Sequence, residues 1–232
     1  MEADRTQMGA SVSTPVLGPV SGRERAFFAG LDLGQKQDYT AIAVIERCRT
    51  VYGARDPVTY EFVSETRYVL THVERLPLGT PYPRVVEHVR DLLRLTGPDA
   101  SLVVDATGVG QPVVDLLRHG GLRRGLIPVT ITGGERAGAS SDGYRVPKRD
   151  LITGLQVAFE TRSLEIAKGV AQVETLISEL MLMRVAVSAA GHERYGVWRE
   201  GAHDDLVLAV ALAWWGMNRR VAPPVWGTRR LI

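Results

Sequence analysis

The chain has 232 residues, of which 45% are hydrophobic, and this size and composition predict one domain with a sizeable core. Its 28 Lys and Arg against 26 Asp and Glu give a formal net charge of +2, which is too small to predict a general affinity for nucleic acid. Cys48 is the only cysteine, which excludes an intrachain disulfide framework and argues against a cysteine-based zinc site. No apolar run reaches the roughly 18 residues that span a bilayer, so no membrane association is expected.

The N-terminal third is predicted to contain a leader and three strands. Residues 1–25 lack the apolar core of a signal peptide and are expected to form a disordered leader. Short apolar runs at 26–33 and 40–46, joined by a polar turn, predict a hairpin, and the alternating run at 58–70 predicts a third strand. Three consecutive strands of this kind indicate an antiparallel meander.

The pattern then changes to alternating strands and helices. Apolar residues at helical spacing, with a proline in the first turn, predict a helix at 83–95. The elements predicted after it are a strand at 101–105, a helix at 111–119, a strand at 126–131, a Gly- and Ser-rich loop at 132–143, helices at 147–162 and 173–183, a short strand at 195–198 and an apolar helix at 204–215. A basic tail follows at 219–232. A meander followed by this alternation predicts one α/β domain over 26–218, in which helices flank a mixed central sheet.

Three acidic positions each lie where an apolar element ends. Asp32 lies within an otherwise apolar strand, Asp105 closes the strand SLVVD, and Asp204 and Asp205 open a helix that continues with apolar residues. Burying a carboxylate without a partner is costly, and no Lys or Arg neighbours these acids in the sequence. If the fold brings the acids together, their repulsion requires a cation, and Mg²⁺ and Mn²⁺ prefer such oxygen ligands.

Each acid also has a structural interpretation when it is considered alone. Asp204 can cap the last helix, Asp105 can be the strand-end acid of any α/β protein, and Asp38 is typical of a turn. Asp32 is the hardest to explain in this way, because strand interiors are depleted in Asp. The prediction of a metal site therefore depends on the combination of acids.

Four segments carry a further signal, and they are, in order, GLDLGQKQDYTAIAVIE, VVDATGVGQPVVDLL, VPKRDLITGLQ and HDDLVLAVALAWW. Together they resemble the C-terminal nuclease domain of phage terminase large subunits, over a stretch from about Phe28 to Trp215. That domain belongs to the ribonuclease H-like, retrovirus-integrase-like superfamily. The resemblance implies a ribonuclease H-like mixed sheet, with the first acid on the first strand, the second at the end of the fourth and the third at the start of the last helix.

The resemblance also implies roles for individual residues. Carried over by position, Asp32, Asp105 and Asp205 are catalytic metal ligands, and Asp204 is a neighbouring ligand. Successive helical residues point about 100° apart, so the two neighbours cannot contribute equally, and we expect Asp205 to be the main ligand.

Two further side chains match accessory positions of the family. His203 precedes the two acids, and it is expected either to touch a metal or orient an acid, or to be a solvent-exposed residue before the helix. Lys148 follows a proline, and it is expected either to meet a DNA phosphate or to face solvent at the start of its helix.

The activity that the resemblance implies is cleavage of double-stranded DNA with two divalent cations, Mg²⁺ or Mn²⁺. One cation would activate water and the other would stabilise the leaving oxygen. Packaging enzymes of this family normally carry an ATPase motor ahead of the nuclease, and no motor is recognised in this sequence, so we expect a detached nuclease domain, a split terminase half or a phage-derived remnant. The expected partners are therefore DNA and a separate ATPase motor, portal or small terminase subunit, in the cytoplasm of a bacterium that carries the phage or prophage.

Two other functions are compatible with parts of the sequence. An actin-like or sugar-kinase-like nucleotide-binding protein also begins with a strand carrying Asp and Gly, but it needs two such domains, for which 232 residues are too few. Gly30, Gly34 and Lys36 fall one residue short of a phosphate-binding loop, so no nucleotide site is expected. The other alternative is a catalytically silent DNA-binding or assembly module of the same fold, against which the filled acid positions argue.

Overall fold

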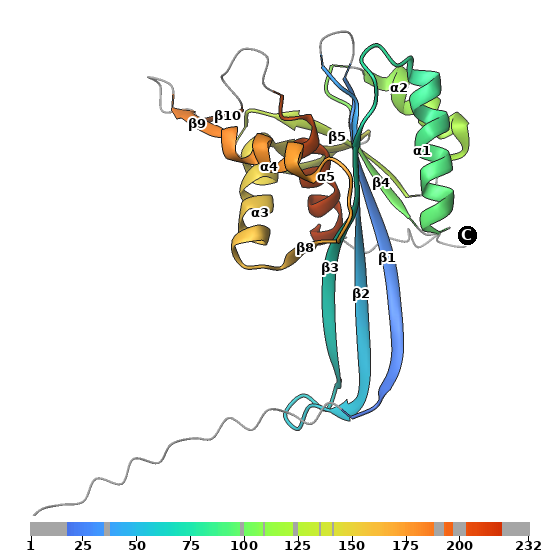
Figure 1. Cartoon of the computed structure of the whole chain (residues 1–232), viewed down its shortest axis with the longest axis vertical. Coiled ribbons are helices and arrows are strands. Elements are labelled where there is room, and N and C mark those ends of the chain that lie inside the picture. Colours follow the sequence, from blue (N-terminus) through green and yellow to red (C-terminus); the bar gives the residue numbers. More distant parts are fainter. Residues whose placement is uncertain are drawn as a thin grey trace, which may run out of the picture.

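The computed structural model describes residues 18–34, 38–97, 100–108, 110–122, 125–134, 136–140, 142–187, 193–196 and 203–219. Most of the predicted leader and all of the basic tail beyond Arg219 lie outside these ranges. The described residues form an eight-stranded sheet with helices on both faces, and a separate two-stranded sheet (Figure 1). No helix in these ranges is long and apolar enough to cross a membrane.

The large sheet combines an antiparallel meander with parallel strands, in the order β6-β7-β5-β4-β1-β2-β3-β8. Its strands are β1 (Val20–Asp32), β2 (Ala41–Arg55), β3 (Phe62–Arg75), β4 (Ser101–Asp105), β5 (Leu126–Thr132), β6 (Gly138–Ser140), β7 (Gly143–Pro147) and β8 (Leu164–Ile166). β1, β2 and β3 pair antiparallel, β4, β5 and β7 extend the sheet from β1 in parallel, and β8 pairs in parallel with β3. This is the mixed sheet that the sequence predicted.

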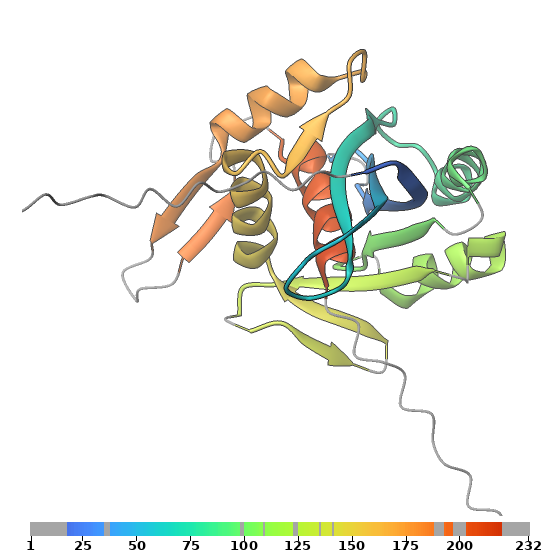
Figure 2. The same cartoon turned by 90° about the horizontal axis from the view of Figure 1, so that it is seen from below.

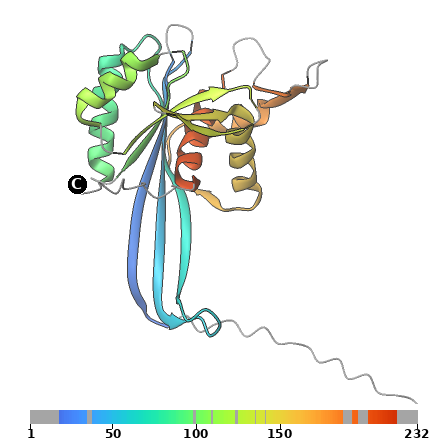
Figure 3. The ribbon, with the colours of Figure 1, turned by 180° about the vertical axis from the view of Figure 1, so that it is seen from behind.

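The meander is longer than the apolar pattern predicted. β1 begins at Val20 and not at residue 26, and β2 continues to Arg55 and not only to residue 46. The added residues pair with one another, as Val20 does with Tyr52, but they are exposed or half-buried, so no hydrophobic pattern marks them. In Figures 1 and 3 this part of the three strands extends well beyond the helices.

The segment before β3 is a turn, although the sequence predicted a strand from residue 58. Oδ1 of Asp56 accepts hydrogen bonds from the backbone N–H groups of Val58 and Thr59, at 2.8 and 2.7 Å. Tyr60 has a φ of 60°, which lies in the left-handed region that strands do not use. The third strand is therefore displaced toward the C-terminus and ends at Arg75.

Helices cover both faces of the sheet, as Figure 2 shows along the strands. The helices are α1 (Tyr82–Thr96), α2 (Gly110–Leu117), the short π-helical segment η1 (Arg118–Leu122), α3 (Lys148–Glu160), α4 (Val173–Leu182) and α5 (Asp205–Asn218). One apolar core lies between the sheet and α1 and α2, and a larger one lies between the sheet and α3, α4 and α5. All five predicted helices are present, with small shifts at their ends.

Short strands are the elements that the sequence analysis missed. β6 lies where a Gly- and Ser-rich loop was predicted, whereas β7, which begins at the last residue of that loop, and β8 were not predicted. The separate sheet pairs β9 (Arg184–Val187), also unpredicted, with β10 (Glu193–Gly196). β10 stands near the strand predicted at 195–198, whose last two residues lie outside the described ranges.

The last helix, α5, is the central element of the larger core, and eleven of its 14 residues are buried. It packs directly on the backbone of β1 at Gly30. A Cβ atom on Gly30 would lie 1.9 Å from the carbonyl oxygen of Ala209 and 2.7 Å from the backbone nitrogen of Ala213. Only glycine allows this approach, which fixes the distance between the first strand and the last helix.

Candidate metal centre

Asp32 and Asp105 are the last residues of two neighbouring parallel strands, β1 and β4. Leu31 of β1 pairs with Val104 of β4, and the next residues, Asp32 and Asp105, therefore lie side by side at the same edge of the sheet. Side chains alternate along a strand, and both acids therefore point to the face on which α5 packs. Oδ1 of Asp105 accepts a hydrogen bond from the backbone N–H of Thr107 at 2.8 Å, which holds that carboxylate at the strand end.

The helix α5 brings the other two acids to the same place. Asp205 lies one helical turn before Ala209, which touches Gly30, and Asp32 lies two residues beyond Gly30 on the same face. Asp205 is 5% exposed and Asp32 is 8% exposed. Asp204 occupies the N-cap position of this helix, but its side chain makes no capping hydrogen bond.

The electrostatics indicate that the four carboxylates are neighbours. Burial raises the pKa of Asp32 well above its usual value, and the charges of Asp105, Asp205 and Asp204 raise this pKa further. Burial also raises the pKa of Asp105, against hydrogen bonds from Thr107 that lower it. The pKa of Asp205 rises to about 6, chiefly through burial. The cluster is therefore unfavourable in its fully charged form.

Lys148, the first residue of α3, lies among these acids and does not simply face solvent. Its Nζ is 2.7 Å from Oδ2 of Asp204, and its side chain is 27% exposed. The ammonium group also lowers the pKa of Asp32 and of Asp105. Lys148 thus offsets part of the negative charge of the cluster.

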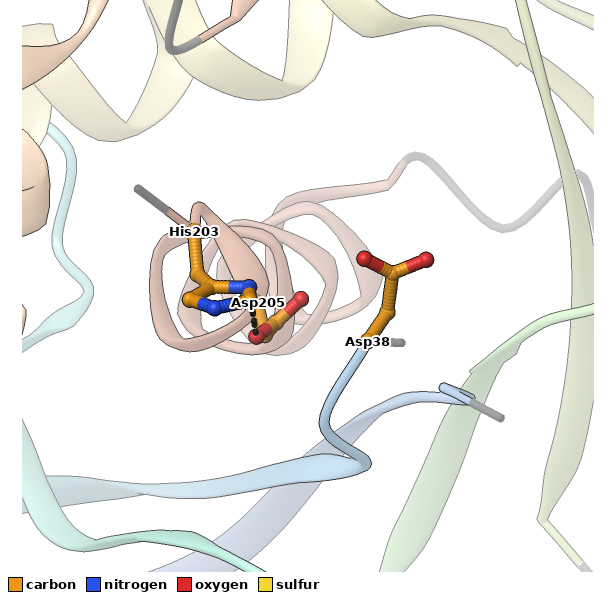
Figure 4. A group of neighbouring side chains, drawn as sticks. All are labelled: Asp38, His203 and Asp205. Carbon is orange, nitrogen blue, oxygen red and sulfur yellow. Dashed lines mark ion pairs between the residues drawn. The ribbon is translucent and has the colours of Figure 1, made fainter. Parts of the chain in front are cut away.

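A second group of possible ligands lies around Asp205. Ligand atoms of Asp38, His203 and Asp205 all lie within 4.8 Å of one another, and Figure 4 shows the three side chains gathered at the start of α5. Nδ1 of His203 is 3.7 Å from Oδ2 of Asp205. The rings of Tyr39 and His203 pack edge to face, with their centroids 5.1 Å apart. His203 was a predicted accessory residue, whereas Asp38 was interpreted as a turn residue only.

Asp38 reaches this position because its backbone lies against Gly34, just beyond the end of β1. A Cβ atom on Gly34 would lie 2.2 Å from the carbonyl oxygen of Asp38, so the loop needs glycine there. A loop that joins two antiparallel strands returns to the edge of the sheet at which the first strand ended. The position of Asp38 between Asp32 and the second strand could therefore have predicted that Asp38 lies near the other acids.

Arg75 and Glu179 lie behind Asp205, and the sequence analysis identified neither. Nη2 of Arg75, at the end of β3, forms a hydrogen-bonded ion pair with Oε1 of Glu179 from α4 and lies 3.6 Å from Oδ2 of Asp205. Burial raises the pKa of Glu179 to about 7, although Arg75 and a backbone hydrogen bond oppose this shift.

The donor set fits a hard divalent cation. It offers five carboxylates and one imidazole, and oxygen-rich sites of this kind suit Mg²⁺ and Mn²⁺. Oδ2 of Asp205 is buried and has no hydrogen-bond partner among the described residues. A buried oxygen in this state is costly unless a cation or water satisfies it.

No protein-family model and no curated protein matches this sequence, but solved structures match its fold. The large terminase nuclease from thermophilic phage G20c, solved with bound magnesium, has a TM-score of 0.55 and 23% identity, over 85% of this chain and 90% of that chain. The nuclease domain of the large terminase of Thermus phage P74-26 has a TM-score of 0.52 and 22% identity, over 85% and 88% of the two chains.

A third match is more distant in sequence. The nuclease domain of the large terminase subunit gp2 of bacterial virus Sf6, solved with manganese, has a TM-score of 0.54 and 13% identity, over 85% and 89% of the two chains. Sequence identities this low show a common fold but do not show a common activity. The chain therefore has the ribonuclease H-like fold of phage large terminase nuclease domains, as the resemblance predicted.

Proposed function

We propose that this chain is a metal-dependent endonuclease that cleaves double-stranded DNA with two divalent cations, Mg²⁺ or Mn²⁺. The observation that carries the proposal is the convergence of Asp32, Asp105 and Asp205 from two strand ends and one helix start. Clustered carboxylates with raised pKa values are typical of functional sites. Nuclease domains of the same fold that were solved with magnesium or manganese support the same chemistry.

The carboxylates would hold the cations in a shared arrangement. The charges of Asp105, Asp205 and Asp204 all act on Asp32, so Asp32 would hold the cations together with these acids. Asp38 and His203 extend the donor set on the side of Asp205. When bound, divalent cations supply an activated water and stabilise the charge that develops on the scissile phosphate.

Lys148 has two tasks in this proposal. Before cations bind, its ammonium group neutralises part of the charge on the carboxylates, Asp204 above all. With cations bound, the same ammonium group would be available to contact a DNA phosphate near the cleavage site.

We further propose that the chain acts in phage DNA packaging, in the bacterial cytoplasm, with a separate ATPase motor, portal or small terminase subunit. The fold it shares with large terminase nucleases supports this context. Its net charge of +2 supports it as well, because a nuclease with so little excess positive charge needs a partner to hold the duplex.

Nicking of supercoiled plasmid tests the function directly. We expect the purified chain to cut in Mg²⁺ or Mn²⁺ and not in EDTA, and Asp32→Asn and Asp105→Asn to abolish the cutting. Asp91→Asn is the matched control, because Asp91 is an exposed acid on α1 that forms only surface ion pairs. Folded protein that binds DNA without cutting it would instead support the silent module, and tight binding of ATP without cutting would support the nucleotide-binding alternative.

A further inference from the structure

Glu179 links α4 to the first turn of α5, where the metal centre lies. It is 4% exposed, although buried Glu is rare unless it is paired. Its Oε2 accepts a hydrogen bond from the backbone N–H of Val207 at 3.1 Å. Because Val207 is two residues beyond Asp205, this bond ties the start of the ligand-bearing helix to the neighbouring helix.

The other oxygen of Glu179 holds Arg75. Oε1 accepts a hydrogen bond from Nη2 of Arg75, whose side chain is 16% exposed. The guanidinium group also lies over the ring of Tyr39, at 4.8 Å from its centroid, and the backbone N–H of Arg75 bonds to Oε1 of Gln172 at 3.1 Å. Contacts from several elements thus fix Arg75.

Arg75 also lies close to Asp205 but does not donate a hydrogen bond to it. The same Nη2 atom is 3.6 Å from Oδ2 of Asp205, which is beyond hydrogen-bond distance. That oxygen is buried and accepts no hydrogen bond within the described part of the chain. A guanidinium group normally forms short, charge-assisted hydrogen bonds with a carboxylate this near. Something must therefore hold Arg75 back, and Glu179 is the charged group in contact with it.

We propose that Glu179 is a positioning residue that keeps Arg75 from closing onto Asp205 and thereby leaves Oδ2 of Asp205 available to a divalent cation. The role of the cation rests on the proposed function, whereas the competition between two carboxylates for Arg75 does not. When Glu179 loses its charge, Asp205 becomes the stronger acceptor for the guanidinium group. Arg75 then competes with the cation for the same oxygen.

Glu179→Gln is the variant that tests this competition. The glutamine keeps the side-chain volume and one oxygen, which can accept the Val207 N–H, while the NH₂ group that replaces Oε1 has no charge and cannot accept a hydrogen bond from Arg75. At a pH above the pKa of about 7 of Glu179, we expect Mn²⁺ to bind at least about tenfold more weakly by isothermal titration calorimetry, because one charge-assisted hydrogen bond now opposes it. The double variant Arg75→Gln with Glu179→Gln removes the competitor, and we expect its Mn²⁺ affinity to return to within about threefold of the parent.

Glu165→Gln is the matched control. Glu165 also pairs with an arginine of β3, Arg67, but this ion pair is exposed at 66% and 51%, and we expect the parent affinity for Mn²⁺. If Glu179→Gln bound Mn²⁺ as tightly as the parent, or if the double variant remained as weak as the single one, Glu179 would not act through Arg75.

A metal-free crystal structure of Glu179→Gln separates this inference from the proposed function. We expect Nη2 of Arg75 within about 3 Å of Oδ2 of Asp205 in that variant, whether or not the parent cleaves DNA. An Arg75 side chain that stayed on the introduced glutamine would overturn the inference. A parent protein that neither binds Mn²⁺ nor cuts plasmid, together with a closed Arg75–Asp205 pair in the variant, would overturn only the nuclease. If Glu179→Gln does not fold, the uncharged double variant tests the inference by titration: Mn²⁺ must bind within about threefold of the parent, and binding about tenfold weaker would overturn the inference.

Discussion

The contact between Gly30 and α5 predicts a large effect of a single methyl group. Gly30→Ala would place a Cβ atom 1.9 Å from the carbonyl oxygen of Ala209 and 2.7 Å from the nitrogen of Ala213. Both are backbone atoms of a buried helix, and neither can rotate away as a side chain can. The helix must therefore move outward, and the carboxylate of Asp205, one turn before Ala209, must move with it.

The size of the effect follows from overpacking. Adding a methyl group to a well-packed core costs about 1–3 kcal/mol, and we expect the upper end because the clash involves backbone. About 3 kcal/mol corresponds to a fall in melting temperature of roughly 6–12 °C for a domain of this size. The affinity for Mn²⁺ should fall as well, because a displacement of about 1 Å is enough to disturb a preorganised site.

Two other glycines serve as controls in thermal unfolding and Mn²⁺ titration. Gly22 lies on the same strand with nothing within 4 Å of its added Cβ, so Gly22→Ala should leave the melting temperature unchanged or slightly higher. A Cβ on Gly216 would lie 2.3 Å from Cγ2 of Val103, a side chain that can shift. Alanine there also gains about 1 kcal/mol of helix propensity, so we expect an intermediate effect. Equal melting temperatures for Gly30→Ala and Gly22→Ala would refute the argument.

Three further predictions concern the acids. Asp32→Asn should raise the melting temperature of the metal-free protein. The gain should grow as the pH rises through the raised pKa of Asp32, because only the charged carboxylate is destabilised. Thermal unfolding at several pH values checks this, and a variant less stable than the parent would contradict it. The stability contributed by Asp205 and Glu179 should be fully present below their unfolded-state pKa values of 3.8 and 4.5 and should be lost as the pH rises through about 6 for Asp205 and about 7 for Glu179. Adding Mn²⁺ should restore that stability mainly at the upper end of this range, because ligands bind the cation in their charged form; stabilisation independent of pH would disagree. Asp205→Asn should weaken Mn²⁺ binding more than Asp204→Asn, because one oxygen of Asp204 already pairs with the ammonium group of Lys148. Equal losses of Mn²⁺ affinity would contradict this difference between the two acids.

The main acids could be predicted from the sequence because each one interrupts an apolar pattern. Asp32, Asp105 and Asp205 stand at the ends of elements whose hydrophobic residues also define those elements. Once the fold is known, the parallel register of β1 and β4 places Asp32 beside Asp105, and the start of α5 places Asp205 near them. The charged and exposed halves of β1 and β2 have no such pattern, because neither face is buried, and their length could not be predicted.

The residues behind the site could not be predicted for a different reason. Arg75 and Glu179 are 104 positions apart in the chain, and each is an ordinary charged residue in its own segment. Only the packing of α4 against the end of β3 makes them a buried pair. Asp38 is the intermediate case, because its place in a hairpin loop beside Asp32 limits where it can lie.

The position of the acids at the start of an apolar helix has an energetic explanation. Raising the pKa of Asp205 from 3.8 to about 6 costs on the order of 3 kcal/mol when the group is charged, at about 1.36 kcal/mol per pH unit. Leu206, Val207, Val210 and Leu212 of the same helix are fully buried, and each contributes about 1.5–3 kcal/mol. The apolar helix thus outweighs the cost of holding Asp205 where its charge is unfavourable. A divalent cation would recover part of this cost on binding, because it favours the charged carboxylate that burial disfavours, and the same carboxylates that lower stability are therefore suited to hold metal.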